Sequence, residues 1–503
     1  MPFTPISLGV PIPSSPHAVS CSLPTMRAII GYEEKEPAVI RALQTGYPRF
    51  VIHPHLNRLR EHYFTPAERH QRDHWFAGSE RAAFALARRL GGIAAVREPR
   101  EGVWVVEHPR DDTLYASAKT YLQMSGTILS SRRAEDLLLA EGLLEKPFPE
   151  QTVDDPEVAT ARIKGVLGRL HGGLEADRIL LTCNGMNAFR ETFLTVAESQ
   201  LAEGRDIWIQ LGWLYTDTMR ILQEWKEENG PVEAFYDVRA TEEIVSWIAR
   251  HADRVAGLIT EAPTNPLLQT ADLVTIAEKV REAGGFMIVD PTLASPYVIN
   301  VSPVADVIIN SLTKYAGNGG DVMAGSIVFP PGSPLFAHRD TIARRCQPLY
   351  HRELSRLAFE VEDYEKLLPV MVERTRQIVD WLEKRPEVAR VYWSGASSSA
   401  ASFARLAVAP ERVAPIFSFT LKKSLAPFFD RLPLPKGPSF GMRNSLVCPF
   451  MYLAHYDLVS QKDGQAFLLR CGMPIDLLRF AVGTEPFADI VEALEEGFRA
   501  YAG

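Results

Sequence analysis

Five short apolar runs between residues 176 and 330 are each soon followed by a residue that could take part in chemistry. These residues are Gly185, Tyr215, Asn265, Asp290 and Lys314. A glycine that opens a helix leaves backbone N–H groups free for an anion, and a tyrosine can stack on a flat ring. A buried aspartate needs a cation or strong donors, and a lysine can form a Schiff base. Each residue alone also has an ordinary structural explanation, so their combination is the informative feature.

The combined set matches the needs of pyridoxal phosphate. That cofactor requires a phosphate site, a stacking ring, a partner for its 3′ oxygen, an acid beside its pyridine nitrogen and a lysine. Ser311 and Thr313 place two hydroxyl groups beside Lys314, and the glycine-rich run 317–320 follows. Hydroxyls, a lysine and adaptable backbone suit a phosphate group next to a Schiff base. We therefore expect this cofactor.

The segments that carry these residues alternate between strand-like and helix-like patterns. Apolar runs occupy residues 179–183, 206–211, 255–261, 286–290, 305–310 and 326–330, and helical stretches separate several of them. This pattern predicts an α/β fold with a large, mostly parallel sheet that helices cover on both faces. Ligands of such sheets bind beyond the carboxyl ends of the strands, where the five residues are expected to meet.

Three regions are expected along the chain. Residues 1–175 would form an N-terminal arm and a mostly helical extension, and residues 176–355 the large cofactor-binding α/β domain. Residues 356–503 would form a smaller C-terminal α+β domain, because strand-like runs there follow one long helical stretch and a helix closes the chain.

Composition limits the function classes. The 503 residues include 54 Lys and Arg against 62 Asp and Glu, and this net charge of −8 argues against nucleic acid as a partner. A membrane span needs ~20 consecutive apolar residues, and we expect none. Prolines crowd the first 26 residues, which argues against an export signal, and the five scattered cysteines favour a reducing, cytoplasmic location. The histidines at 53–74 lack the spacing of a zinc site, so no metal is expected.

Two segments resemble a known family. EAPTNPLLQTADLVTIAEKVREAGGFMIVDPTLASP and NSLTKYAGNGGDVMAGSIV resemble the trans-sulfuration (Cys/Met metabolism) branch of fold-type I pyridoxal-phosphate enzymes. The likeness runs from about residue 176 to the C-terminus. The segments HAVSCSLPTMRAIIGYEE, TGYPRFVIHP and SGTILSSRRAED are similar to the longer fungal-type cystathionine γ-synthases. The resemblance implies a fold-type I transferase.

This resemblance implies roles in cofactor binding. Lys314 would form the Schiff base, Asp290 would pair with the pyridine nitrogen, and Tyr215 would stack on the ring. Asn265 would lie near the 3′ oxygen or the substrate carboxylate. The phosphate would be held by two hydroxyls and two backbone N–H groups, those of Ser311, Thr313, Gly185 and Met186.

The resemblance also implies how the substrate and a second subunit contribute. Arg479, in LRFAVGTE, would bind the substrate α-carboxylate with help from Ser439 in PSFG. A forked guanidinium suits that task because it fixes the orientation of a carboxylate as well as its charge. The family also uses an arginine that reaches the phosphate of the neighbouring subunit. We expect Arg132 in this role, with Arg49 as the alternative.

The implied reaction is γ-replacement on an O-acyl-L-homoserine by a thiol, cysteine, which gives cystathionine. Such a step belongs to methionine biosynthesis and cysteine metabolism. O-acylhomoserine sulfhydrylase and cystathionine or methionine γ-lyase are the alternatives with the same cofactor apparatus. A non-catalytic binding protein is the alternative from another class, and the intact Lys314, Asp290 and Arg479 argue against it. The implied partners are small amino-acid substrates and further copies of the chain, in a homodimer or homotetramer.

Overall fold

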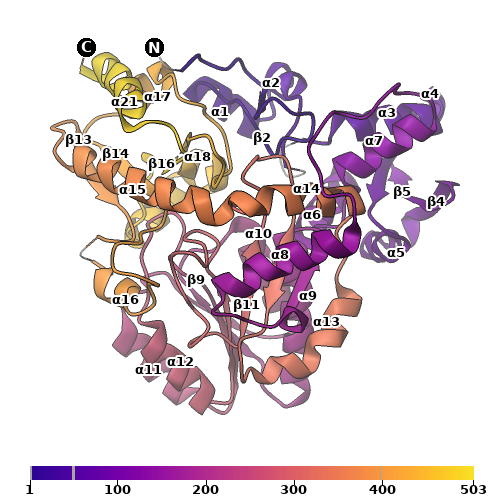
Figure 1. Ribbon diagram of the computed structural model, residues 1–503. Helices are drawn as coiled ribbons and strands as arrows, with labels where there is room; N and C mark the ends of the chain where they lie inside the picture. Colours follow the sequence, from indigo (N-terminus) through magenta and orange to yellow (C-terminus); the bar gives the residue numbers. More distant parts are fainter. Residues whose placement is uncertain (1–2, 48–50, 397, 503) are drawn as a thin grey trace.

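A seven-stranded sheet forms the centre of the molecule (Figure 1). The computed structural model describes residues 3–47, 51–396 and 398–502. The strand order is β6-β12-β11-β10-β9-β7-β8. Among these described strands, β12 runs in the direction opposite to the other six. The strands are β6 Ile179–Thr182, β7 Ile207–Leu211, β8 Val232–Phe235, β9 Val255–Glu261, β10 Phe286–Asp290, β11 Val307–Ser311 and β12 Gly325–Val328. The predicted mostly parallel α/β sheet is confirmed.

Helices cover both faces of this sheet, which explains its continuous apolar strands. Successive strand residues point to opposite faces, so Leu258 packs into one apolar core and Ile259 into the other. The first core receives α8 Pro156–Leu170, α11 Thr241–Arg250, α12 Leu273–Glu282 and α14 His351–Glu360. The second receives α9 Gly185–Ala202, α10 Thr216–Glu228 and α13 Arg339–Arg345. A strand buried on both sides has no reason to alternate with polar residues.

A four-stranded antiparallel sheet lies in the C-terminal part, in the order β13-β14-β16-β15. Its strands are β13 Val388–Tyr392, β14 Ile416–Leu421, β15 Leu446–Pro449 and β16 Leu477–Ala481. The helices here are α15 Tyr364–Glu383, α16 Ala400–Ala404, α17 Ala426–Arg431, α18 Phe450–Ala454, α19 Tyr456–Val459, α20 Lys462–Arg470 and α21 Phe487–Ala502. Buried Phe419 and Phe480 of the sheet share a core with Phe428 of α17 and Phe498 of α21. This arrangement is of the α+β kind that the sequence predicts.

The N-terminal region is less helical than its sequence suggests. It contains α1 Met26–Glu33, α2 Pro37–Ala42, α3 Pro54–Tyr63, α4 Pro66–Gln71, α5 Glu80–Arg89, α6 Asp112–Ser125 and α7 Ser131–Ala140. It also contains a short hairpin, β1 Pro11–Ile12 with β2 Ser20–Cys21, and a three-stranded antiparallel sheet of β3 Arg72–Ala77, β4 Ala95–Arg100 and β5 Val103–Pro109. The central strand β5 buries Val105 against α3 and α7 and Val106 against α5 and α6.

The first residues run as an arm over the rest of the chain. Val19 N–H donates to Gly320 O at 2.9 Å, and Leu23 N–H donates to Lys436 O at 2.9 Å. The Ser20 hydroxyl also donates to Pro438 O at 2.6 Å. The arm therefore contacts both the loop after β11 and the loop before β15, which brings its end at Tyr47 close to both. Among the described residues, no helix combines the length and apolar character that crossing a membrane requires.

Candidate active site

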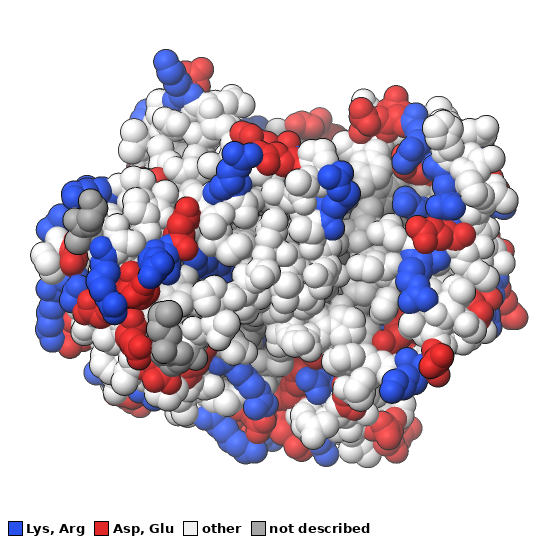
Figure 2. Space-filling model, turned by 90° about the horizontal axis from the view of Figure 1, so that it is seen from above, with Lys and Arg blue, Asp and Glu red and all other residues white. Residues whose placement is uncertain are grey.

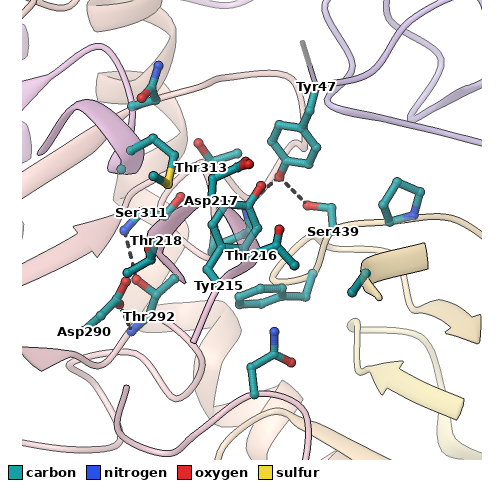
Figure 3. Close-up of a pocket in the computed structure, with 18 of the residues that line it drawn as sticks. Tyr47, Tyr215, Thr216, Asp217, Thr218, Asp290, Thr292, Ser311, Thr313 and Ser439 are labelled. Carbon is teal, nitrogen blue, oxygen red and sulfur yellow. Dashed lines mark hydrogen bonds between the residues drawn. The ribbon is translucent and has the colours of Figure 1, made fainter. Parts of the chain in front are cut away.

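The carboxyl ends of the central strands border a cavity of about 210 Å³. Figure 3 shows Asp290, Thr292 and Ser311 on one side of this cavity and Tyr47 and Ser439 on the other. The cavity wall includes ten of the residues predicted from the sequence: Gly185, Met186, Tyr215, Asn265, Asp290, Ser311, Thr313, Lys314, Ser439 and Arg479. They come from loops that are far apart in the sequence and that the two sheets bring together.

Strand register explains why the polar residues meet. Asp290 ends β10 and lies directly opposite Glu261, which ends the neighbouring parallel strand β9. Ser311 ends β11, and its backbone N–H donates to the Thr292 hydroxyl at 2.9 Å. Thr292 N–H in turn donates to a carboxylate oxygen of Asp290 at 2.8 Å. Parallel strands place their carboxyl ends at one edge, and these short contacts then fix the side chains there.

The first turn of α9 offers a site for the phosphate group. The Asn184 side chain caps this helix by accepting the Asn187 N–H at 2.9 Å. The first N–H groups of an α-helix have no acceptor within the helix, which leaves those of Gly185 and Met186 directed at the cavity edge. A Cβ atom on Gly185 would lie 3.1 Å from Ser311 Cβ, so glycine allows α9 and β11 to approach closely.

Lys314 lines the cavity, and its amine contacts aromatic groups. Its Nζ donates to the Tyr47 hydroxyl at 2.6 Å and lies 4.7 Å from the centre of that ring. It also lies 5.3 Å from the centre of the Phe440 ring. Burial, and secondarily the charge of Arg479, lower the pKa of Lys314 to about 7. A neutral amine is therefore present near neutral pH, which a nucleophile or a base requires.

Two carboxyl groups share the far end of the cavity. Burial raises the pKa of Asp290 to about 6. The pKa of Glu261 is raised well above its usual range by burial and by the Asp290 charge, while Glu261 accepts the Tyr215 N–H at 2.5 Å. Two buried carboxyl groups are costly to ionise together, so a ligand that brings positive charge is favoured. The ring nitrogen of a pyridinium meets this need. Glu261 was not among the predicted site residues, although its position at a strand end beside Asp290 could have indicated it.

Arg479 approaches the cavity from β16. Its guanidinium donates to Asn265 Oδ1 at 3.2 Å and to Ser439 O at 3.3 Å. The guanidinium carbon lies 4.6 Å from the centre of the Phe450 ring. Both acceptors are neutral oxygens, so the positive charge of Arg479 remains available for a substrate carboxylate. Ser439 has a left-handed backbone with φ of 98°, and its hydroxyl is 2.7 Å from the Tyr47 hydroxyl.

The structure does not place Arg132 at the cavity of its own chain, and its role at the phosphate of a neighbouring subunit stays a prediction. Arg132 is fully buried on α7, where its guanidinium lies 2.6 Å from both Glu150 and Glu353 and 3.5 Å from Asp321. Three carboxylates of its own chain thus neutralise it. The alternative, Arg49, lies outside the described residues, whereas its neighbour Tyr47 reaches Lys314 of the same chain.

The residues fit pyridoxal phosphate. A helix N-terminus with two hydroxyls suits the phosphate, and Tyr215 lines the cavity with its side chain exposed. Lys314 has a pKa of about 7, so part of its amine is neutral near neutral pH, and Asp290 stands where a ring nitrogen would need an acid partner.

The comparisons with known proteins agree with this fit. A family model described as Cys/Met metabolism PLP-dependent enzyme matches residues 160–499. L-2-amino-4-chloropent-4-enoate dechlorinase/desaturase of Streptantibioticus cattleyicolor is 33% identical over 491 residues, which cover 97% of both chains. Cystathionine γ-synthase of Neurospora crassa is 24% identical and is aligned over 98% of both chains.

A solved structure shares the fold. Cystathionine γ-synthase from Xanthomonas oryzae pv. oryzae, in complex with aminoacrylate and cysteine, superposes with a TM-score of 0.58. It is 22% identical, and the match covers 69% of this chain and 88% of that one. The fold is therefore that of fold-type I enzymes. Because the family model spans the central sheet, the lysine and the C-terminal sheet, the chain belongs to the Cys/Met metabolism family of pyridoxal-phosphate-dependent enzymes.

Proposed function

We propose that the protein acts on an L-α-amino acid that carries a leaving group on Cγ. The observation that carries this proposal is the presence of Arg479 and Lys314 in one cavity, with the Arg479 charge free for a carboxylate. An amino acid bound through its carboxylate would present its Cα to the Lys314 amine. The relative from Streptantibioticus cattleyicolor supports reaction at Cγ, since it is named for an amino acid with chlorine on its fourth carbon, which is Cγ.

The chain's own residues have distinct tasks in such a reaction. The bound cofactor supplies a sink for the electron pair that forms when Cα loses its proton. Lys314, with its pKa near 7, accepts that proton and can return one to a neighbouring carbon. The Tyr47 hydroxyl, 2.6 Å from Nζ, orients the amine. Asp290 would hold the proton of the cofactor ring nitrogen, and Arg479 would fix the substrate carboxylate.

We infer that elimination of the Cγ group, rather than its replacement by cysteine, is the favoured outcome. Within the described lining of the cavity, the cationic side chains are Lys314 and Arg479. If Arg479 pairs with the first substrate, the other described lining residues offer the carboxylate of an incoming cysteine no comparable partner, and burying it unpaired is costly. The relative that is 33% identical is a dechlorinase/desaturase, which supports the same choice.

The reaction expected from the sequence, γ-replacement on an O-acyl-L-homoserine by cysteine to give cystathionine, is the second candidate. The observation that favours it is the alignment of Neurospora crassa cystathionine γ-synthase along nearly the whole chain. O-acylhomoserine sulfhydrylase and γ-lyase activities would use the same residues.

A substrate panel with product analysis separates these reactions. Cofactor-loaded protein is incubated with L-2-amino-4-chloropent-4-enoate, O-acetyl-L-homoserine and O-succinyl-L-homoserine, each with and without cysteine or sulfide. Elimination predicts release of the leaving group without a thiol and a desaturated or deaminated product by mass spectrometry. Cystathionine that forms only with cysteine supports the second candidate. If none of the three substrates reacts, the proposal fails. The Lys314→Ala protein is the control for reactions that the cofactor catalyses alone.

We also propose a homodimer or a dimer of dimers and a cytoplasmic location. The family resemblance supports the assembly, and the five free cysteines support a reducing compartment. Sedimentation equilibrium tests the assembly, and a fully active monomer would contradict it.

A further inference from the structure

Part of the wall of the active-site cavity lies outside the region that the family model matches. The model begins at residue 160, yet the cavity is also lined by five earlier residues: Tyr47, Leu122, Gln123, Gly126 and Ile128. Four of these come from the end of α6 and the loop that follows it. The extension that precedes the matched region is therefore part of the cavity and not a separate appendage.

This loop is held firmly between α9 and the N-terminal sheet. The Asn184 amide donates to Gly126 O at 2.7 Å, and the Asn187 amide donates to Ser125 O at 2.9 Å. On the other side, Leu129 N–H donates to Phe76 O at 3.0 Å. Gly126 has φ of 65°, and a Cβ atom there would lie 2.0 Å from Asn184 Oδ1, so the loop has no room to shift toward α9. A wall held in this way can discriminate between ligands by size.

Two apolar side chains separate the main cavity from a smaller one. Ile128 and Met323 line both the main cavity and a neighbouring cavity of about 30 Å³. The smaller cavity is also lined by His17, His53 and Glu353. Ile128 and Met323 are both half-buried and thus stand between the reaction site and a group of ionisable side chains.

The direction of the substrate side chain follows from its anchor. Arg479 enters the cavity from β16, which Figure 1 labels at the upper left, whereas Ile128 enters from the loop after α6, which is labelled right of centre in that view. A substrate with its carboxylate at Arg479 and its Cα at Lys314 must extend its remaining carbons away from Arg479. We propose that Ile128, together with Leu122 and Met323, forms the wall that limits the substrate to an L-α-amino acid with a short side chain and an uncharged end. This inference rests on the proposed function, because it assumes an amino acid anchored at Arg479.

The test measures binding of unreactive amino acids to the cofactor-loaded protein by isothermal titration calorimetry. The probes are L-norvaline, L-norleucine and L-glutamate, whose side chain matches that of norleucine in length but ends in a charge. The wild type is expected to prefer norvaline over both of the others. Ile128→Ala and, independently, Met323→Ala should raise the affinity for norleucine relative to norvaline by at least about tenfold, because each removes part of the wall. Val158→Ala, an exposed apolar position on α8, is the matched control and should change neither affinity.

The outcomes separate this inference from the proposed function. An unchanged preference in both wall variants, or glutamate binding to the wild type as tightly as norvaline, would overturn the proposed wall and leave the reaction at Cγ standing. If the loaded wild type binds none of the three amino acids, the proposed function fails and the wall fails with it. If Arg479→Lys weakens the binding of all three probes to a similar extent, and the wild type discriminates between probes by side-chain length, both proposals are supported.

Discussion

Burial shifts the pKa values of Lys314 and Asp290 in opposite directions. It lowers the pKa of Lys314 to about 7 and raises the pKa of Asp290 to about 6, because in each case it disfavours the charged form. Near neutral pH the amine is thus ready to accept a proton, and the carboxyl group is ready to share one with a ring nitrogen. Both shifts come from one enclosed site, so the two residues form a functional unit.

We expect Lys314→Ala to abolish turnover while the fold remains. The mutation removes the only buried amine among the described cavity residues, and with it the base that takes the Cα proton. Steady-state kinetics with a reactive substrate provides the measurement, and circular dichroism checks the fold. Substantial activity in the cofactor-saturated variant would show that another group is the base.

Arg479→Lys should raise KM far more than it weakens cofactor binding. Lysine keeps the charge but loses the planar fork that matches a carboxylate. The loss of one charge-assisted hydrogen bond is worth about 1.5–3 kcal/mol, or roughly 10- to 150-fold in kcat/KM. Kinetics of the variant are compared with its cofactor affinity from fluorescence titration. An unchanged kcat/KM would make Arg479 an ordinary strand residue.

At the scale of elements, the sequence predicts the central sheet well and the N-terminal sheet poorly. β9, β10 and β11 are continuous apolar runs because both of their faces are buried, and this also made the polar residues at their ends conspicuous. β5 lies within the extension that the sequence predicts to be mostly helical. Its two faces pack against helices from other parts of the chain, which no local pattern records.

The same limit applies to two residues near the site, Arg132 and Tyr47. Ser130-Ser131-Arg132 suggests a phosphate-binding arginine locally, but Glu150 and Glu353 come from later segments and surround it only in the folded chain. Tyr47 reaches Lys314 because the arm crosses the loop before β15, and this path depends on contacts hundreds of residues apart. The division at about residues 175 and 355 stays a prediction.

Arg132→Met should destabilise the protein without removing the cofactor site. Arg132 joins α7 to α14, and its removal leaves Glu150 and Glu353 buried without their common cation. Breaking such a buried pair costs about 3–5 kcal/mol. Urea unfolding measures the change, and Arg169→Met is the control, since it breaks an exposed pair with Glu365 worth at most about 1 kcal/mol. Unchanged stability with lost cofactor affinity would contradict this structural role and support the predicted contact of Arg132 with a phosphate.

At the scale of the whole molecule, charges of both signs are mixed on the surface, whereas the interior contains a defined group of titratable histidines. Figure 2 shows acidic and basic side chains interspersed around a largely uncharged centre on the face seen from above. Inside, three histidines meet where the arm joins α3 and α7. The ring centres of His53 and His55 are 4.7 Å apart, and that of His17 lies 6.1 Å from His55. His17 is also 3.5 Å from Glu135 of α7.

These histidines are expected to make the fold sensitive to acid. Burial lowers the pKa of His53 to about 3 and that of His55 to about 4, with smaller contributions from neighbouring charges. The unfolded chain has the ordinary pKa of 6.5, so it binds more protons than the folded chain between pH 4 and pH 6.5. Above pH 6.5 the two histidines therefore do not reduce the free energy of unfolding. As the pH falls from 6.5 toward 4, they reduce it progressively. Asp290 has the opposite effect on the pH dependence of stability, because its raised pKa makes the folded state bind more protons than the unfolded state below about pH 6.

A matched variant isolates the contribution of His55 from that of Asp290. Neither ring nitrogen of His55 has a hydrogen-bond partner among the described residues, so leucine can replace the ring at pH 7 without breaking one. The charges that face His55 are those of His17, Glu135 and Arg58, and all three remain in the variant. When the pH is lowered from 7 to 5, we expect the free energy of unfolding to fall less in His55→Leu than in the wild type. The expected difference between the two proteins is about 1 kcal/mol, after allowance for the partial exposure of the ring. Urea unfolding of both proteins at the two pH values gives this difference directly. A difference that does not change with pH would mean that His55 stays accessible to protons in the folded state and that the acid sensitivity arises elsewhere.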